Sequence, residues 1–316
     1  MQDLLTKAKI DLIIPTYKPD EKFHKLMKRL KKQTVQPDHI WVINTITEPA
    51  TIDIEEQYKD MPNLKVIHIS KNDFDHGGTR NSGASLSDAE FVMFMTQDAV
   101  PTDEYLIENM LEGFREERIA VVYGRQLAGK EVGTVERYTR TFNYPSEDSV
   151  KTMEDIERLG IKTYFCSNVC AAYRKTVYNE LGGFVTKTIF NEDMIMASKI
   201  INAGYAIAYA SSAKVIHSHK YTYWEQFTRN FDMAVSQQQY KEIFENIKSE
   251  SEGIKLVKQS IKYLNKTKKP YLIPDLILQS GFKFLGYKAG RNYEKLPKAL
   301  IKKFSMNKSY WNEREN

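Results

Sequence analysis

The chain has 316 residues, of which 41% are hydrophobic, and a net charge of +5, so it can bury a full α/β core plus a smaller appendage and is not a disordered chain. The four-residue spacing of its two cysteines, Cys166 and Cys170, matches neither a redox Cys-x-x-Cys motif nor a zinc site, and we expect reduced, buried thiols. No uncharged apolar run reaches 18 residues and the first ten residues lack the apolar core of a signal peptide, which predicts a cytoplasmic chain without a membrane span.

The first hundred residues alternate strand patterns with helix patterns. Residues 10–15 form an apolar run closed by a proline, and Phe23, Leu26, Met27 and Leu30 follow at helical spacing. Further strands are predicted at residues 40–44, 64–69 and 90–95. This order predicts an α/β fold whose sheet is mostly parallel, with right-handed crossovers and flanking helices.

Polar residues follow three of these predicted strands. In open α/β sheets, ligands bind beyond the carboxyl ends of the strands. We therefore expect one binding pocket where three strands end, formed by Pro15, Thr16, Tyr17, Asn44, Gln97 and Asp98.

A glycine pair follows the third predicted strand, in residues 73–81. Gly77 and Gly78 permit close backbone approach, and Arg80 in the first helical turn is a candidate contact for a nucleotide base or phosphate. The alternative is a flexible loop followed by an ordinary surface arginine.

Asp98 lies just after a buried strand. A carboxylate at this position can hold Mg²⁺ or Mn²⁺, which prefer oxygen ligands and bridge phosphate oxygens. Taken alone, an Asp before Pro101 is also typical of a turn or a helix N-cap.

A second acidic cluster, Glu192 and Asp193, begins a helical pattern that ends near Gly204. A carboxylate at a helix start can project into a pocket and accept a proton from a hydroxyl group. We assign the general base to Asp193 and an orienting role to Glu192. Acidic residues here would also complement the helix dipole, which is the structural alternative.

Two histidines, His217 and His219, follow the apolar residues 215 and 216. A strand conformation would direct both imidazoles to the same face, where they could complete a metal site. The alternative is that both are structural histidines with internal partners.

The C-terminal region is basic. From residue 251 onward there are 15 Lys and Arg against 5 Asp and Glu, whereas residues 1–250 carry 31 against 36. Apolar residues recur beside the lysines at helical spacing and no nucleic-acid module is present, so we predict an anionic membrane surface as partner rather than nucleic acid. A solvated helical cap is the alternative. The lysines that would flank the apolar helices are Lys262, Lys266, Lys268, Lys269, Lys283 and Lys288.

Together these motifs resemble the inverting glycosyltransferases of family 2, which have the GT-A fold. The resemblance covers residues 10 to 230 and is carried by residues 13–17, 78–81, 97–98, 172–174, 181–184 and 192–193. Within that family, the Asp-His-Gly-Gly-Thr-Arg-Asn and Thr-Gln-Asp-Ala segments are similar to those of bacterial rhamnosyltransferases of cell-wall rhamnan, capsule or O-antigen synthesis. The resemblance implies two regions, a GT-A transferase domain at 1–230 and a basic amphipathic helical region at 231–316.

The resemblance also implies roles for the matching residues. Pro15, Thr16 and Tyr17 would line the nucleotide pocket, Arg80 would touch the nucleotide, Asp98 would hold a metal diphosphate and Asp193 would be the base. The donor would be dTDP-β-L-rhamnose, and the acceptor would be lipid-linked at the inner face of the plasma membrane. The alternatives are a UDP-hexose or UDP-N-acetylhexosamine transferase, or a non-catalytic scaffold that binds a sugar nucleotide at a membrane surface.

The chain departs from the family pattern at two places. The usual Asp-x-Asp is Gln97-Asp98-Ala99, which predicts weaker metal dependence. Asn44-Thr45 replaces the acidic pair that commonly reads the base, so the base contacts would pass to Asn44, Asp73 or Asp75.

Overall fold

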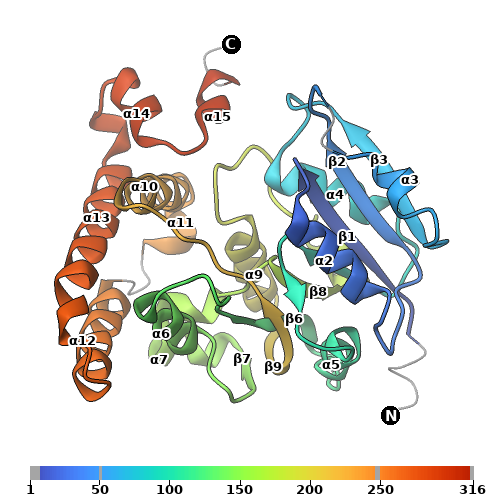
Figure 1. Ribbon diagram of the computed structural model, residues 1–316, viewed down its shortest axis with the longest axis horizontal. Coiled ribbons are helices and arrows are strands. Elements are labelled where there is room, and N and C mark those ends of the chain that lie inside the picture. Colours follow the sequence, from blue (N-terminus) through green and yellow to red (C-terminus); the bar gives the residue numbers. More distant parts are fainter. Residues whose placement is uncertain (1–7, 50–51, 246–249, 314–316) are drawn as a thin grey trace.

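A computed structural model describes residues 8–49, 52–245 and 250–313. Within these residues, nine strands form one sheet with the order β3-β2-β1-β4-β8-β6-β9-β5, and β7 pairs with β9 (Figure 1). The strands are β1 (Ile10–Tyr17), β2 (Ile40–Thr45), β3 (Leu64–Ile69), β4 (Phe91–Met95), β5 (Val100–Pro101), β6 (Ile119–Leu127), β7 (Ser149–Lys151), β8 (Cys170–Arg174) and β9 (Ala206–Ile216).

Helices connect and cover the strands. Those of the first half are α2 (Glu21–Leu30), α3 (Ile54–Gln57), α4 (His76–Ser85), α5 (Leu106–Glu112), α6 (Thr134–Asn143) and α7 (Ile156–Leu159), with 3₁₀ turns η1 (Met153–Asp155) and η2 (Gly160–Tyr164). Those of the second half are α8 (Lys175–Glu180), α9 (Glu192–Asn202), α10 (Tyr223–Gln239), α11 (Lys241–Phe244), α12 (Glu250–Lys266), α13 (Ile273–Arg291), α14 (Lys298–Phe304) and α15 (Lys308–Glu313), with η3 (Pro270–Leu272) and η4 (Tyr293–Lys295).

The direction of the strands changes across the sheet. The four strands predicted from the sequence, β1 to β4, are present and run parallel, as expected. Beyond them, β8 enters between β4 and β6 and runs antiparallel to both. The pairs β5–β9 and β7–β9 are also antiparallel, while β6–β9 is parallel. The sheet is therefore mixed: β1 to β4, β6 and β9 run in one direction, as the predicted mostly parallel sheet requires, and β5, β7 and β8 run in the other. The antiparallel strands were not predicted, because apolar periodicity predicts that a strand forms and not its direction.

Two apolar cores cover the two faces of the sheet. On one face, alternate residues of β1 pack against α2, α3 and α5; the predicted helix face of Phe23, Leu26, Met27 and Leu30 is fully buried there. On the other face, α4, α8 and α9 pack against β4, β6 and β8. Cys166 and Cys170 are buried free thiols, as predicted.

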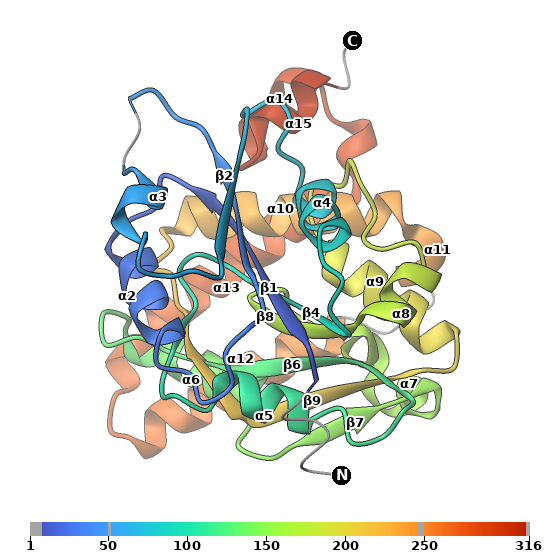
Figure 2. The same ribbon diagram turned by 90° about the vertical axis from the view of Figure 1, so that its right-hand side faces the viewer.

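The C-terminal helices form a layer of their own. Helix α13 packs along α10, and α12 and α13 lie on the side of the molecule away from β2 and β3 (Figure 1). In Figure 2 they recede behind the sheet. The boundary predicted at residue 230 falls inside α10, which is one continuous helix that packs with the C-terminal layer. Among the described residues, no helix is both long and apolar enough to cross a bilayer.

Candidate active site

The carboxyl ends of β1, β2 and β4 lie together at one edge of the sheet. Thr16 Oγ1 donates a hydrogen bond to Asn44 Oδ1 at 2.9 Å. The Tyr17 backbone N–H donates to Gln97 Oε1 at 2.7 Å, and Gln97 Nε2 donates back to the Tyr17 carbonyl at 3.1 Å. Pro15 is half-buried and the Tyr17 ring is exposed. Hydrogen bonds thus join the end of β1 to the end of β2 and to Gln97, the residue directly before Asp98.

The glycine pair lies inside helix α4 and not in a flexible loop. Asp75 is the N-cap of α4: its Oδ1 accepts a hydrogen bond from Gly78 N–H at 2.6 Å, and its Oδ2 accepts one from Lys187 N–H at 2.9 Å. At Gly77 a Cβ would lie 1.9 Å from the Val185 carbonyl oxygen, so only glycine permits this contact. Asp75 and Gly77 therefore hold α4 against the 185–187 loop, and Gly78 contributes its N–H to the Asp75 cap. A nucleotide contact of Asp75 and Gly78 stays a prediction.

Arg80 is buried and faces an acidic residue. Its Nη1 lies 3.4 Å from Glu192 Oε1 and donates to the His76 carbonyl at 2.7 Å. Its Nε has no hydrogen-bond partner among the described residues. The arginine that we expected to touch the nucleotide thus serves as the counter-charge of Glu192. Burial acts to raise the pKa of Glu192, but the Arg80 charge, together with His76 and hydrogen bonds from the backbone and Asn168, holds that pKa below its usual value.

Asp193 has a different environment from its neighbour. Both residues open α9, after Asn191 in the left-handed conformation at φ 65°. Asp193 Oδ2 accepts a hydrogen bond from the Asn168 backbone N–H at 3.3 Å. Burial, followed by the negative charge of Glu192, raises the pKa of Asp193 to about 7. A carboxyl group with such a pKa can accept a proton near neutral pH, which suits a general base.

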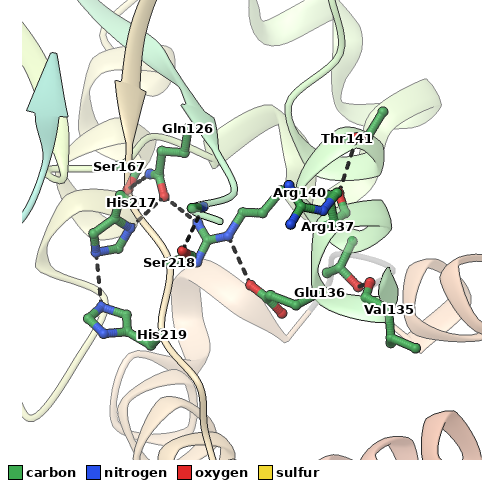
Figure 3. Close-up of polar contacts among 12 residues, drawn as sticks. Gln126, Val135, Glu136, Arg137, Arg140, Thr141, Ser167, His217, Ser218 and His219 are labelled. Carbon is green, nitrogen blue, oxygen red and sulfur yellow. Dashed lines mark hydrogen bonds and ion pairs between the residues drawn. The ribbon is translucent and has the colours of Figure 1, made fainter. Parts of the chain in front are cut away.

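Asp98 lies beside both predicted histidines. Strand β5 pairs with β9 so that Val100 lies opposite Ile216, and this register brings the residue before β5 next to the residues after β9. Asp98 Oδ1 lies 3.6 Å from His217 Nε2, and Asp98 Oδ2 lies 3.4 Å from His219 Nε2. The two Nε2 atoms are 3.0 Å apart (Figure 3). The helix N-cap alternative for Asp98 is wrong, since the next helix begins at Leu106 and is capped by Tyr105.

The donor set of these three residues, here named the Asp-His-His triad, fits a metal ion. One ligand atom from each residue lies within 4.8 Å of the others. Burial lowers the pKa of both imidazoles despite the nearby carboxylate, so they are neutral, which is the form that binds metals. His217 Nδ1 lies 3.0 Å from Gln126 Oε1, which leaves the Nε2 lone pair facing the triad. Two nitrogens and a carboxylate suit Mn²⁺ better than Mg²⁺.

Three residues that were not predicted from the sequence connect the Asp-His-His triad to the acidic pair of Glu192 and Asp193. They are Gln126, Ser167 and Asn168. Gln126 Oε1 also accepts a hydrogen bond from Arg140, and Gln126 Nε2 donates to Ser167 Oγ at 3.0 Å (Figure 3). The next residue, Asn168, contacts Asp193 through its backbone and donates a long side-chain hydrogen bond to Glu192 Oε1 at 3.5 Å. Two consecutive residues thus connect the triad to the acidic pair.

Lys151, which also went unrecognised, anchors the segment that contains Ser167 and Asn168. Its ammonium group donates to the carbonyls of Lys162 and Phe165 and lies over the Tyr123 ring, 4.8 Å from the centroid. Burial lowers the pKa of Lys151 to about 7. No sequence motif marks this residue, because its partners are backbone carbonyls.

Arg229 places a positive charge between the Asp-His-His triad and the acidic pair. Its guanidinium lies 4.7 Å from the Phe190 ring centroid and 5.8 Å from the Tyr221 ring centroid. Tyr221 packs against His219 at 5.3 Å, and Phe190 precedes the acidic pair. Asp232, one turn further along α10, instead accepts hydrogen bonds from the Met306 and Asn307 backbones and so ties down the C-terminal segment.

Comparison with known proteins gives a consistent answer. The model of glycosyl transferase family 2 matches residues 11–182. The O-antigen chain rhamnosyltransferase RfbN of Salmonella typhimurium is 42% identical over 306 residues, which cover 96% of each chain. The O-antigen chain rhamnosyltransferase WbaN of Salmonella anatum is 40% identical over 95% of each chain.

Solved structures share the fold at low sequence identity. The mannosyltransferase PcManGT from Pyrobaculum calidifontis, in complex with GDP-Man and Mn²⁺, superposes with a TM-score of 0.57 at 14% identity, over 96% of this chain and 85% of that one. Staphylococcus aureus TarS 1–349 in complex with UDP-GlcNAc gives 0.52 at 16% identity, over 91% of both chains. The chain therefore belongs to glycosyl transferase family 2 and is a glycosyltransferase of the GT-A fold.

Proposed function

We propose that this enzyme transfers L-rhamnose from dTDP-β-L-rhamnose to a hydroxyl group of a lipid-linked O-antigen or related cell-surface glycan. Its similarity along nearly the full chain to two O-antigen rhamnosyltransferases supports the sugar and the class of product. The observation that carries the chemistry is the link from the Asp-His-His triad to Asp193 through Ser167 and Asn168. This link joins a cation site to a base, which are the two parts that inverting transfer needs.

Asp193 is the general base in this proposal. The acceptor hydroxyl oxygen attacks the anomeric carbon while its proton passes to the Asp193 carboxylate. The bond between that carbon and the diphosphate oxygen breaks in the same step, and the nucleoside diphosphate leaves with the electron pair. Because the attack comes from the face opposite the leaving group, a β-linked donor gives an α-linked rhamnoside. Glu192 remains ionised beside Arg80 and keeps the pKa of its neighbour high.

Asp98, His217 and His219 would hold the divalent ion, Mn²⁺ by preference. A bound divalent cation supplies positive charge to the diphosphate oxygens as they become the leaving group. Gln126 orients His217, and Arg229 adds a fixed positive charge between the triad and the acidic pair. Arg229 would thereby stabilise the negative charge that develops on the leaving diphosphate.

The strand ends would bind the nucleotide. Thr16 and Asn44 are already hydrogen-bonded to each other, and the Gln97 amide holds the Tyr17 backbone, so little reordering is needed when a nucleotide binds. Tyr17 exposes 43% of its surface and can stack on the base. The acceptor would be reached at the inner face of the plasma membrane.

A panel of dTDP- and UDP-sugars, assayed with and without Mn²⁺, tests this proposal. We expect transfer or donor hydrolysis with dTDP-rhamnose, faster with Mn²⁺. Turnover of a UDP-hexose or UDP-N-acetylhexosamine in preference to dTDP-rhamnose would contradict the donor assignment but not the family.

A further inference from the structure

Helix α13 and the turn before it present large apolar side chains to solvent. Tyr271 is 71% exposed, Ile277 48%, Leu278 51%, Phe284 59% and Leu285 55%. The last four recur at seven-residue spacing, so they lie on one face of the helix. These five residues are named the apolar ridge here. Exposed apolar patches of this kind mark surfaces that meet another phase or molecule.

The opposite face of α13 is packed in an unusual way. A Cβ at Gly286 would lie 2.1 Å from the Phe227 carbonyl oxygen, and one at Gly290 would lie 2.3 Å from the Phe231 carbonyl oxygen. Small residues therefore face α10, backbone against backbone, and large apolar residues face outward. A surface helix ordinarily buries its large apolar residues, so the outward face of α13 is suited to an apolar partner.

The apolar ridge is bordered by basic residues. Lys266 and Lys268 are exposed just before Tyr271, and Lys288 is exposed one turn after Phe284 and Leu285. The one acidic residue of α13, Asp275, is half-buried and accepts a hydrogen bond from the Tyr223 hydroxyl at 2.6 Å. The outward face is therefore apolar with a positive border.

Two of the six lysines predicted to face a membrane have other roles. Lys269 donates a hydrogen bond to Thr134 at 3.1 Å, and Lys283 lies on the α10 side of the helix, where burial lowers its pKa. The periodicity of the sequence could not separate these two lysines from the exposed ones, because the direction of each side chain depends on how α13 docks.

We infer that the outward face of α13 docks on a lipid bilayer with anionic headgroups, with the apolar ridge in the headgroup region and Lys266, Lys268 and Lys288 against the anionic groups. The inference deepens the proposed function and rests on it, since a docked enzyme would reach a lipid-linked acceptor. A second copy of the chain is the poorer partner, because a symmetric contact would bring the positive borders of the two copies together.

The position of α13 suits this role. It packs on α10, which carries Arg229 at the site, so docking would leave the site about one helix layer, roughly 10 Å, from the membrane surface. An acceptor sugar on a membrane lipid would then lie within reach while the nucleotide donor enters from water.

Cosedimentation of the full chain with vesicles tests the inference. We expect binding to vesicles with 30% phosphatidylglycerol at low salt, at a level roughly tenfold above binding to phosphatidylcholine alone, and release at high salt. The double variant Phe284→Ser/Leu285→Ser should bind roughly tenfold more weakly. Lys288→Glu should lose about fivefold at low salt. The control Leu86→Ser, at another exposed apolar residue, which caps the C-terminus of α4, should bind as the wild type does.

Two outcomes would overturn the inference. One is the absence of binding to anionic vesicles at low salt. The other is a ridge variant that binds vesicles normally but converts a dimer to a monomer in sedimentation, which would make the ridge a contact between copies. Donor hydrolysis in vesicle-free solution separates this test from the proposed function, since a ridge variant should keep wild-type hydrolysis even if docking fails.

Discussion

Arg80 and Glu192 form a buried ion pair, with 3.4 Å between Nη1 and Oε1, directly beside Asp193. The pair gives two adjacent carboxyl groups different properties. Glu192 stays ionised beside Arg80, its counter-charge. Burial, followed by the negative charge of Glu192, raises the pKa of Asp193. Two carboxyl groups in contrasting environments are a common basis for separate roles at one site.

Replacing Asp193 with Asn should abolish transfer. In the wild type, activity should rise with pH through about 7, because the base must be deprotonated to accept the acceptor proton. Measurement of kcat/KM against pH, with circular dichroism as the control for folding, checks both points. Transfer retained by the Asn variant would remove Asp193 from the role of base.

The same substitution should stabilise the fold. The pKa of Asp193 is raised in the folded state, so the protonated carboxyl group contributes fully to the free energy of unfolding at acidic pH. This contribution is lost as the pH rises through about 7. The neutral Asn side chain avoids this loss. We expect Tm of Asp193→Asn to exceed that of the wild type by roughly 2–4 °C or more at pH 8, and by less at pH 5. If Asp193→Asn and the wild type had the same Tm at pH 8 and also at pH 5, the raised pKa of Asp193 would be contradicted.

Replacing Arg80 should lower the free energy of unfolding strongly and should change the affinity for dTDP much less. Arg80→Met leaves Glu192 buried without its counter-charge, which typically costs about 3–5 kcal/mol. The double variant Arg80→Met/Glu192→Gln should recover much of this loss. The matched control is Arg118→Met, which breaks an exposed pair with Glu116 and should cost about 1 kcal/mol or less. Urea unfolding and dTDP binding are the measurements. A large loss of dTDP affinity in a stably folded Arg80 variant would restore its role as a nucleotide contact.

The Asp-His-His triad should bind Mn²⁺ directly. Asp98→Ala and His219→Ala should each abolish Mn²⁺ binding in titration calorimetry, and chelation should slow donor turnover by the wild type. Gln126→Ala should weaken Mn²⁺ binding about 10–100-fold by releasing His217. His39→Ala, which removes another histidine beside a carboxylate, Asp11, is the control and should not change Mn²⁺ affinity. Unchanged binding in the Asp98 and His219 variants would rule out the triad as the metal site.

Arg229→Met should lower kcat by about 10²–10³ with a smaller effect on dTDP affinity, because its charge acts on the leaving group. Arg229→Lys keeps the charge and should restore part of the rate. The exposed Arg158→Met is the control and should retain the wild-type rate. A rise in KM alone would assign Arg229 to ground-state binding instead.

Local patterns were sufficient to locate the first four strands and the face of α2. The first five residues of β1 are all buried, as its apolar run predicts, and burial along α2 follows the helical period of its apolar residues, so these elements depend mainly on neighbours along the chain. The motifs at Asp98, Asp193 and His217 were recognisable for a similar reason, since Asp98 and His217 follow an apolar strand pattern and Asp193 begins a helical one.

Other features depended on how remote segments meet. The contact of His217 with Gln126 joins residues 91 apart in the chain, and it forms because β6 and β9 are neighbours in the sheet. The antiparallel entry of β8 places Ser167 and Asn168 between the triad and Asp193. Arg80 meets Glu192 because α4 and α9 cover the same face of the sheet. Short-range periodicity determines whether a segment tends to form a helix or a strand, whereas strand order and helix docking decide which side chains become partners.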